Sequence, residues 1–293
     1  MINIAFLTAQ NYPKLTSDEN LLIDALKNYD IGVSPIIWED SNLNLNNYPM
    51  TIIRTVWDYH EKFNSFQSFL QANQSINLFN NQKVIQWNIN KSYFNDLQNL
   101  GIKIPYFKIF TKPFSLIDFM QTNNLTLAIL KPCISAGGRN TYLVNKNTAV
   151  KYQNNINEIL AFSPVIVQEF IPEIQTQGEW SFIYFNRVFS HAVLKKTAKQ
   201  EFKVQERFGG TVKAINPNQK ILNVSNAILK KLPYDLLYAR IDAVITNSEF
   251  YIMELELFEP SLFLAYNEKA TDNFCQAIKS RLSEYVQNPS SRR

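Results

Sequence analysis

Three acidic residues interrupt an apolar run with strand-like composition near the end of the sequence, EFYIMELELFEPSL (249–262). Their neighbours are phenylalanine, isoleucine, methionine and leucine, which are typical of a buried strand. Carboxylates in apolar surroundings are costly unless a cation or a metal ion pairs with them. Glu254 and Glu256 share one face, because side chains alternate along a strand, and Glu259 follows them. The run is therefore either an amphipathic edge strand or a place where acids hold a cation.

The preceding strand-like run, YARIDAVIT, carries Asp242, which a turn near residues 247–249 places opposite or diagonal to Glu254. Carboxylates converging from two adjacent strands repel one another unless they are neutralised. Hard oxygen ligands of this kind suit Mg²⁺, which usually binds one or two carboxylates together with substrate phosphates. Asp242, Glu254 and Glu256 are thus candidate metal ligands, with the polar face of an edge hairpin as the alternative. Arg240 shares a face with Asp242 and is a candidate to stabilise a developing oxyanion.

Glycine is rare in this sequence, with only seven residues, four of which come as two pairs. Such a chain is expected to use glycine where the backbone needs positive φ or approaches a ligand closely. The pair Gly137-Gly138 lies in KPCISAGGRNT, after Lys131 at a strand end and beside Ser135. Backbone N–H groups of such a loop, with a lysine nearby, suit phosphate oxygens. The loop is not a P-loop, because its lysine precedes the glycines. An ordinary hairpin turn is the alternative.

Two further stretches could contact a nucleotide or a substrate. In VQEFIPEIQTQGEW, an apolar run with Phe170 and a later Glu179 could receive a base and ribose hydroxyls, although a core strand is the simpler interpretation. Arg54, Trp57 and Asp58, in RTVWDYH, form a charged and aromatic cluster at a strand end. That cluster is a candidate amino-acid pocket, with a structural salt bridge beside a packed tryptophan as the alternative.

The elements that must position these residues change character along the chain. Strand-like and helical runs alternate to about residue 85, which predicts a small α/β unit with a parallel sheet. Its first strand-to-helix turn, TAQNYP, lacks the glycines of a dinucleotide-binding fingerprint. Strand-like runs dominate after that, and His191 alternates with Val193 and Lys195 on one of them, where we interpret it as structural. The expected class is α/β (α+β).

Composition narrows the functional classes. The 293 residues suffice for about two domains, and 46% apolar residues suffice for a sizeable core. A formal charge of +4 does not favour nucleic acid or anionic membrane as a partner. Two cysteines make no disulfide framework, and two histidines exclude a histidine-rich zinc site. No run approaches the ~20 apolar residues of a membrane helix, so a cytoplasmic protein is expected; a homodimer is left open.

Five stretches resemble, in order, the motifs of the ATP-grasp superfamily: NKSYFNDLQNLGIKIP, LKPCISAGG, VQEFI, EFKVQERFGG and RIDAV…YIMELE, over about residues 86–265. The chain is most similar to the glutathione-synthetase-like and ribosomal-modification-ligase-like group. GEWSFIYFNRVFSHAVLKK and ELELFEPSLFL resemble more narrowly the cyclo-ligase of D-cycloserine biosynthesis and its uncharacterised relatives. The resemblance implies a pre-ATP-grasp substrate domain (1–85), an ATP-grasp N-terminal lid subdomain (86–165) and a C-terminal subdomain (166–293).

The resemblance also implies individual roles. ATP would be the cofactor, with Mg²⁺ or Mn²⁺ as the ion, and an amino-acid-like small molecule the substrate. The implied contacts are Lys91 and Lys131 with phosphates beneath a loop containing Ser135, Gly137 and Gly138; Glu169, Phe170 and Ile171 with adenine; Glu179 with ribose; Asp242, Glu254 and Glu256 with the ion; and Arg54, Trp57, Asp58 and Ser181 with the substrate.

Two departures from the family pattern bear on the substrate. GEWS puts Ser181 where glutathione-synthetase-like enzymes commonly have an arginine that meets substrate. EFKVQ puts Lys203 in place of an arginine, which keeps a cation but loses the bidentate fork. Lys203 and Arg240 remain candidate catalytic residues. Both changes argue against glutathione and poly-glutamate substrates and leave ATP use untouched.

These observations predict an ATP- and Mg²⁺-dependent ligase that joins a carboxylate to an amine through an acyl phosphate, acting on an amino acid or a small peptide. An intramolecular cyclo-ligase with an O-ureidoserine-like substrate is one alternative. A non-catalytic ATP-binding protein is another, although the intact lysines and acids argue against it. Two alternative roles are open for Glu259: it orients Arg240, or it orients the substrate's amine.

Overall fold

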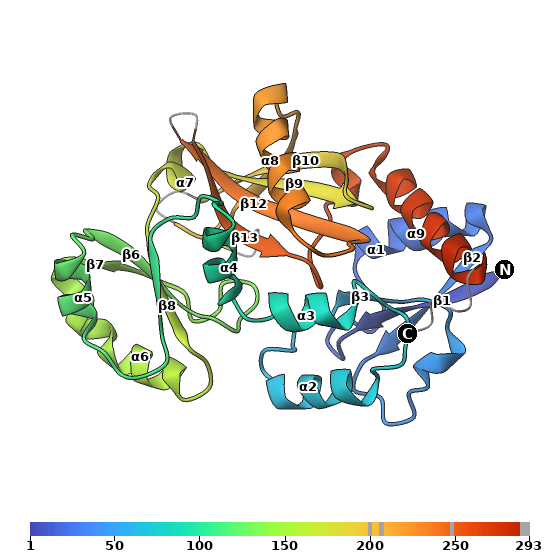
Figure 1. Ribbon diagram of the computed structural model, residues 1–293, viewed down its shortest axis with the longest axis horizontal. Helices are drawn as coiled ribbons and strands as arrows, with labels where there is room; N and C mark the ends of the chain where they lie inside the picture. The colour runs from blue at the N-terminus through green and yellow to red at the C-terminus, as the bar shows by residue number, and fades with distance from the viewer. Residues whose placement is uncertain (199–200, 205–207, 247–248, 288–293) are drawn as a thin grey trace.

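The computed structural model describes residues 1–198, 201–204, 208–246 and 249–287, arranged around three sheets (Figure 1). One sheet is parallel and two are antiparallel, which confirms the expected mixed α/β class. The expected turn at Asn247-Ser248 lies outside the described residues.

The first domain is the predicted parallel α/β unit. Its sheet has the order β2-β1-β3-β4, and every pairing is parallel. β3 is buried along its whole length, as expected for a parallel strand covered on both faces. The elements are β1 (Ile2–Thr8), α1 (Ser17–Leu26), η1 (Lys27–Tyr29), β2 (Ile31–Ile37), η2 (Leu45–Asn47), β3 (Thr51–Thr55), α2 (Phe63–Ala72) and β4 (Leu78–Phe79).

Two short helices, α3 (Gln82–Asn88) and α4 (Tyr93–Asn99), lead into the segment predicted to be a lid, which lies at the left of Figure 1 and keeps that name below. The lid is an antiparallel sheet of order β5-β8-β6-β7, and its core includes residues from α5, η3 and α6. Because β8 pairs with β5 and β6, we propose that the lid ends after Glu169 and not at residue 165. The lid elements are β5 (Phe107–Phe110), α5 (Leu116–Thr122), β6 (Leu127–Pro132), β7 (Tyr142–Asn145), η3 (Lys146–Tyr152), α6 (Gln153–Leu160) and β8 (Val165–Glu169).

The C-terminal sheet is antiparallel, with the order β11-β10-β9-β12-β13. The last helix, α9, shares a buried apolar cluster with α1 of the first domain, so the two ends of the chain pack together. The elements are α7 (Glu173–Thr176), β9 (Glu179–Phe185), β10 (Val188–Lys196), β11 (Thr211–Ile215), α8 (Gln219–Lys231), β12 (Tyr238–Thr246), β13 (Glu249–Glu256), η5 (Leu264–Tyr266) and α9 (Ala270–Gln287).

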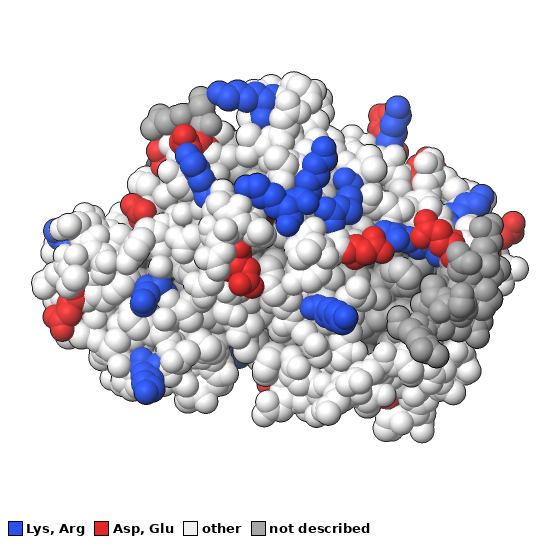
Figure 2. Space-filling view, in the orientation of Figure 1, with Lys and Arg blue, Asp and Glu red and all other residues white. Residues whose placement is uncertain are grey.

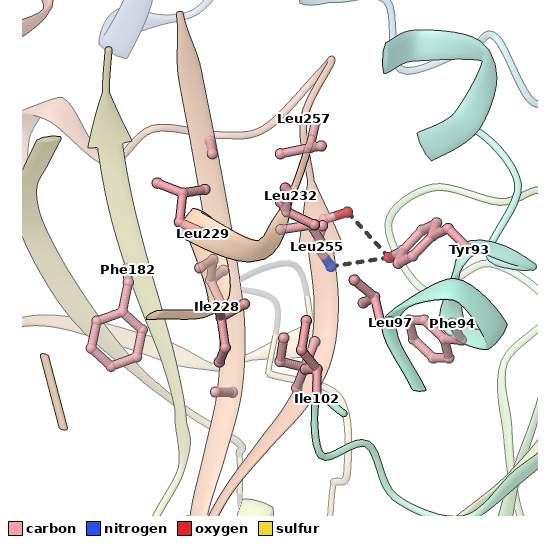
Figure 3. Packing of buried hydrophobic residues seen from close by; sticks show 14 of the residues in the cluster. Tyr93, Phe94, Leu97, Ile102, Phe182, Ile228, Leu229, Leu232, Leu255 and Leu257 are labelled. Carbon is pink, nitrogen blue, oxygen red and sulfur yellow. Dashed lines mark hydrogen bonds between the residues drawn. The ribbon is translucent and has the colours of Figure 1, made fainter. Parts of the chain in front are cut away.

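Side chains of α3 and α4 occupy the outer edge of β13, the last strand of its sheet. The Asn88 amide donates to the Leu255 carbonyl and accepts from the Leu257 N–H, both at 2.8 Å. The Tyr93 hydroxyl accepts from the Leu255 N–H at 3.0 Å and donates to its carbonyl at 3.1 Å (Figure 3). Below them, Ile102, Phe182 and other apolar side chains form one core. These contacts hold β13, which carries Glu254 and Glu256, against the helices that precede the lid.

On the face shown in Figure 2, basic side chains gather near the middle and top, and most of the remaining surface is uncharged. No helix within the described part of the chain is both long and apolar enough to cross a membrane. Most of the charged residues with predicted roles line a cavity between the three parts of the fold.

Candidate active site

A cavity of about 770 Å³ lies where the first domain, the lid and the C-terminal sheet meet. Trp57 reaches it from the first domain, Lys131 from the lid and Asp242 from the C-terminal sheet. Its volume is within the usual range for small-molecule and cofactor sites. Most of the predicted site residues line it: Trp57, Asp58, Lys91, Lys131, Ser135, Gly137, Gly138, Phe170, Glu179, Lys203, Arg240, Asp242, Glu254 and Glu256.

The hairpin of β12 and β13 places Asp242 directly opposite Glu254, as the sequence predicts, with a bulge immediately after the pair. One Asp242 oxygen accepts from the Ser181 hydroxyl at 2.6 Å and from Arg240 Nε at 3.0 Å. The other accepts from Lys195 Nζ at 2.9 Å and from Arg240 Nη2 at 3.0 Å. Burial would raise the pKa of Asp242, but Arg240 and Lys195 outweigh it and lower that pKa. Asp242 is therefore an ionised carboxylate.

Arg240 stands between the acids of the two strands. Besides Asp242, it donates to the Glu256 carboxylate and, from Nη1 at 2.9 Å, to the Ser261 carbonyl. Burial raises the pKa of Glu256 well above its usual value, and Arg240 offsets this only in part because neighbouring acids add to it. The positive charge of the Arg240 guanidinium therefore offsets the negative charge of two carboxylates, Asp242 and Glu256.

Two lysines of the cavity differ in their partners. Lys91 Nζ lies 3.0 Å from a Glu254 oxygen and donates to the Ser135 carbonyl at 2.9 Å. Lys131 has no salt bridge within the described residues, and its ammonium lies 5.6 Å from the ring centre of Phe94. Burial lowers the pKa of Lys131, Glu254 partly restores it, and Lys91 lowers it further. Lys131 is thus a half-buried lysine well placed for an anion supplied by a ligand.

Lys195 is a buried site residue to which sequence reasoning assigned no role. Its Nζ lies 2.5 Å from Glu179 and 2.9 Å from Asp242, so it holds the carboxylate predicted to meet ribose. Burial lowers the pKa of Lys195, but Asp242 and Glu179 outweigh it and raise that pKa. Gly178 makes this pairing possible, because at φ +89° a Cβ there would lie 2.5 Å from the Lys195 carbonyl. Lys195 lies opposite Glu179 only because the register of the β9–β10 hairpin shifts between Phe189 and His191; plain counting from the turn would have placed Leu194 there.

One part of the cavity wall is apolar, with Ile129, Phe170 and Met253 among its lining. Gln168 also lines it, and its side-chain NH₂ is buried without a hydrogen-bond partner among the described residues. A buried donor without a partner is costly. Two predicted adenine contacts do not line the cavity: Glu169 is exposed, and Ile171 is buried beside it.

The predicted substrate residues separate into two groups. Trp57 and Asp58 line the cavity, whereas Arg54 and Ser181 do not. Ser181 is buried, and its hydroxyl donates a hydrogen bond to the Asp242 carboxylate. Arg54 is also buried. Its Nη2 donates to Glu19 at 3.0 Å and to the Pro260 carbonyl at 2.8 Å. The direct substrate role predicted for Arg54 and Ser181 is therefore corrected to support of groups that line the cavity.

The glycine loop closes one side of the cavity. Gly137 and Gly138 adopt φ of +59° and +73°, which explains the choice of glycine. Arg139, the next residue, forms an ion pair with Glu61 of the first domain, and both line the cavity. This contact links the lid to the first domain, and nothing local in the sequence points to it.

His191 does not line the cavity. Its Nε2 lies 2.9 Å from the Leu262 carbonyl and 3.2 Å from the Phe263 carbonyl, which makes it the donor to one or both. Burial lowers the pKa of His191 to about 4, and those carbonyls partly oppose the shift. This supports the structural interpretation. Glu259 does line the cavity, and burial together with Glu254 raises its pKa to about 7.

Within the described ranges, no three acidic, histidine or cysteine side chains are grouped so that they could hold a metal ion. These acids are instead paired with cations of the chain: Lys91 contacts Glu254, and Arg240 contacts both Asp242 and Glu256. The donor set still suits a hard divalent cation, because its oxygens are carboxylates that line one cavity. The acids would have to exchange these cationic partners for the ion.

Two family models match the chain. Residues 97–269 match the ATP-grasp domain of prokaryotic glutathione synthetase, and residues 4–80 match the N-terminal domain of the D-cycloserine synthetase DcsG. The cycloserine biosynthesis protein DcsG of Streptomyces lavendulae is 23% identical over 279 residues, which cover 89% of this chain and 92% of that protein.

Solved structures show the same fold. The crystal structure of the D-cycloserine synthetase DcsG superposes with a TM-score of 0.87 at 22% identity, covering 96% of this chain and 99% of that one. The D-alanine–D-alanine ligase of Bacillus anthracis complexed with ATP superposes with a TM-score of 0.67 at 18% identity, covering 99% and 100%. ATP-grasp enzymes use ATP and divalent metal ions. The chain belongs to the prokaryotic glutathione-synthetase ATP-grasp family and is an ATP-grasp ligase that forms carbon–nitrogen bonds.

Proposed function

We propose that this enzyme uses Mg²⁺–ATP to join the carboxylate of an amino-acid-like substrate to an amine through an acyl phosphate. The observation that carries the proposal is the half-buried ammonium of Lys131, which has no salt bridge among the described residues and lines a cavity with Lys91 and Glu254. Two lysines beside a glycine loop suit the phosphates of a nucleotide, and the adjacent acids suit its ion.

The nucleotide base is proposed to lie against Phe170, where the lining is apolar. The unpartnered NH₂ of Gln168 would donate to a ring nitrogen there, which removes the cost of leaving it unsatisfied. Glu179 keeps its predicted role toward ribose, oriented by Lys195. Glu169 and Ile171 would contribute through the backbone alone, since neither side chain lines the cavity.

Glu254, Glu256 and Asp242 would hold Mg²⁺, with Mn²⁺ as a substitute. When bound, the ion would neutralise charge on the phosphoryl oxygens during transfer. Glu254 is the best placed, because Lys91 would be drawn from it to phosphate. Asp242 already accepts four hydrogen bonds, so it would contribute only by losing one of them.

In the proposed reaction a substrate carboxylate oxygen attacks the γ-phosphorus, the bond to ADP breaks, and an acyl phosphate forms. An amine nitrogen then attacks the acyl carbon, inorganic phosphate leaves with the carbon–oxygen bonding pair, and the nitrogen loses a proton. Arg240 and Lys203, both in the lining, would stabilise the oxyanion of that second step. The Arg139–Glu61 contact would keep the loop over the acyl phosphate and exclude water.

Intramolecular ring closure is a second candidate. It is favoured by the match of residues 4–80 to the DcsG N-terminal domain, because that domain carries the substrate-facing Trp57 and Asp58. A D-cycloserine-type enzyme would take an O-ureidoserine-like substrate and close it upon itself. Both candidates share the acyl phosphate and differ only in where the amine comes from.

The test is ADP release at fixed Mg²⁺–ATP with D- and L-amino acids and O-ureidoserine, supplied singly and in pairs. Stimulation by one compound, with a cyclic product identified by mass spectrometry, would establish ring closure. Stimulation by pairs alone would establish intermolecular ligation. Calorimetric ATP binding without ADP release from any member of the panel would count against the proposal and in favour of a non-catalytic ATP-binding protein.

A further inference from the structure

The acidic side chains that line the cavity differ in their partners. Six of them have a lysine or arginine of the chain within salt-bridge distance. The seventh, Glu259, has none within the described residues, and its carboxylate accepts no hydrogen bond there. The paired acids are Asp58 with Lys62, Glu61 with Arg139, Glu179 and Asp242 with Lys195, Glu254 with Lys91, and Glu256 with Arg240.

The cations whose charge acts on Glu259 form their salt bridges with other acids. Arg54 binds Glu19 through Nη2, although its Nε and Nη1 have no hydrogen-bond partner among the described residues. Arg240 binds Asp242 and Glu256, and Lys91 binds Glu254. Each lowers the pKa of Glu259 from a distance, but none forms a salt bridge with it. A half-buried carboxylate facing a cavity without a partner cation is costly in the empty protein. A cationic group of a ligand would remove that cost.

The backbone that carries Glu259 is held rigidly, although it belongs to no strand. Segment 259–262 lies between β13 and η5, and each of its four carbonyls accepts from a side chain of another segment. Trp57 Nε1 donates to the Glu259 carbonyl at 2.9 Å, and Arg54 donates to the Pro260 carbonyl at 2.8 Å. The remaining two carbonyls, of Ser261 and Leu262, accept from Arg240 and His191.

The side chains of this segment divide between the interior and the cavity. Pro260 and Leu262 are buried, whereas Glu259, Ser261 and Phe263 line the cavity. The side chains toward the core and the bound carbonyls thus fix the direction of the Glu259 carboxylate. A site held in place before its ligand arrives binds more tightly, because less freedom is lost on binding.

We propose that Glu259 receives the ammonium group of the organic substrate, at the end of the cavity formed by Trp57 and Asp58. This inference rests on the proposed function and specifies its substrate as an amino acid with a free α-ammonium. The ammonium would donate to the Glu259 carboxylate and lie near the Ser261 hydroxyl, which also lines the cavity. The carboxylate to be activated would extend from there toward Arg240 and the phosphates.

The experiment measures binding apart from turnover, by calorimetry, with a non-hydrolysable ATP analogue and Mg²⁺ present. The probes are O-ureido-D-serine, D-alanine and L-alanine, and for each the matching compound without the α-amino group. The variants are Glu259→Gln, which removes the charge at nearly constant volume, and Glu259→Asp, which retracts it. Glu268→Gln is the matched control, since Glu268 is exposed and outside the lining.

We expect at least one amine-bearing probe to bind wild-type enzyme more tightly than its des-amino counterpart. Glu259→Gln should weaken that probe about 10- to 100-fold, the loss expected for a charge-assisted hydrogen bond. The des-amino compound and the ATP analogue should bind both proteins equally. Glu259→Asp should lie between, and Glu268→Gln should match wild type.

Three results would overturn the assignment: equal weakening of amine and des-amino probes, no weakening at all, or a shifted Mg²⁺ titration, which would make Glu259 a metal ligand. Failure of every amine-bearing probe to bind would do the same. Failure of the proposed function is distinguishable, because it would show as Glu259-dependent binding of an amine without ADP release when ATP replaces the analogue.

Discussion

The two proposed ends of the cavity differ in how their charged groups are paired. At the proposed phosphate end, charges are abundant and most are paired within the chain, through Lys91, Lys195 and Arg240. At the proposed substrate end, segment 259–262 is held through its carbonyls, and Glu259 has no salt bridge among the described residues. In this proposal the phosphate end exchanges partners when a ligand binds, whereas the substrate end is fixed beforehand. Within the described part of the chain, each end leaves one charge without a salt bridge, Lys131 for an anion and Glu259 for a cation.

The strongest way to break this comparison is to remove the acids of the phosphate end. Glu254→Gln combined with Glu256→Gln should lower kcat/KM by roughly 1,000-fold, because phosphoryl charge would lose its metal-bound counterion. The Mg²⁺ concentration at half-maximal ADP release should rise in each single variant. Unchanged metal dependence in both single variants would refute their role as ligands.

Lys131→Met should act on the nucleotide alone. Removing the unpaired ammonium should weaken ATP binding about 100-fold in calorimetry, since a desolvated cation contacts phosphate more strongly than one in water. Lys131→Arg serves as the control that keeps the charge, and it should recover part of the affinity. If Lys131→Met impaired amino-acid binding as much as ATP binding, the division of the cavity into two ends would be wrong.

Arg54→Lys tests whether Arg54, which does not line the cavity, positions the proposed substrate end through the Pro260 carbonyl. Lysine keeps a cation beside Glu19 but cannot also hold the Pro260 carbonyl in the same geometry. KM for the organic substrate should rise about 10-fold as the segment loosens, with KM for ATP unchanged. An equal rise in both constants would indicate a general structural defect instead.

His191 gives the smallest effect on turnover and a distinct pH signature. Its pKa is about 4 in the fold and 6.5 without it, so the unfolded chain binds more protons between those values. Stability should therefore fall as pH drops from 6.5 toward 4, by at most about 3 kcal/mol. His191→Gln should lose this part of the pH slope in urea unfolding and keep wild-type activity at pH 7.5. Identical slopes would contradict the assignment.

Prediction from sequence succeeded where partners are close along the chain or fixed by strand alternation. The pairing of Asp242 with Glu254 followed from a hairpin, and the parallel first domain followed from alternating strands and helices. The lysines and the glycine loop came from motif order. Their placement around one cavity agrees with that order, although their catalytic roles stay predictions.

What could not be predicted depends on contacts between distant segments. Arg54 contacts Pro260 from 206 residues away, and Arg139 contacts Glu61 across the boundary between lid and first domain. The same residue types would suit a substrate pocket or a structural support, and only the packing decides between them. The pairing of Lys195 with Glu179 was also hidden, because it depends on a register shift within the β9–β10 hairpin.

The side chains along the outer edge of β13 have a consequence for how the molecule behaves at high concentration. An edge strand with free N–H and C=O groups can recruit a strand from another molecule and start aggregation. Asn88 and Tyr93 occupy both polar groups of Leu255 and the N–H of Leu257, so that stretch is closed to intermolecular pairing. The strand that carries the acids is thereby protected as well as positioned, and its amides should be among the slowest to exchange with solvent deuterium.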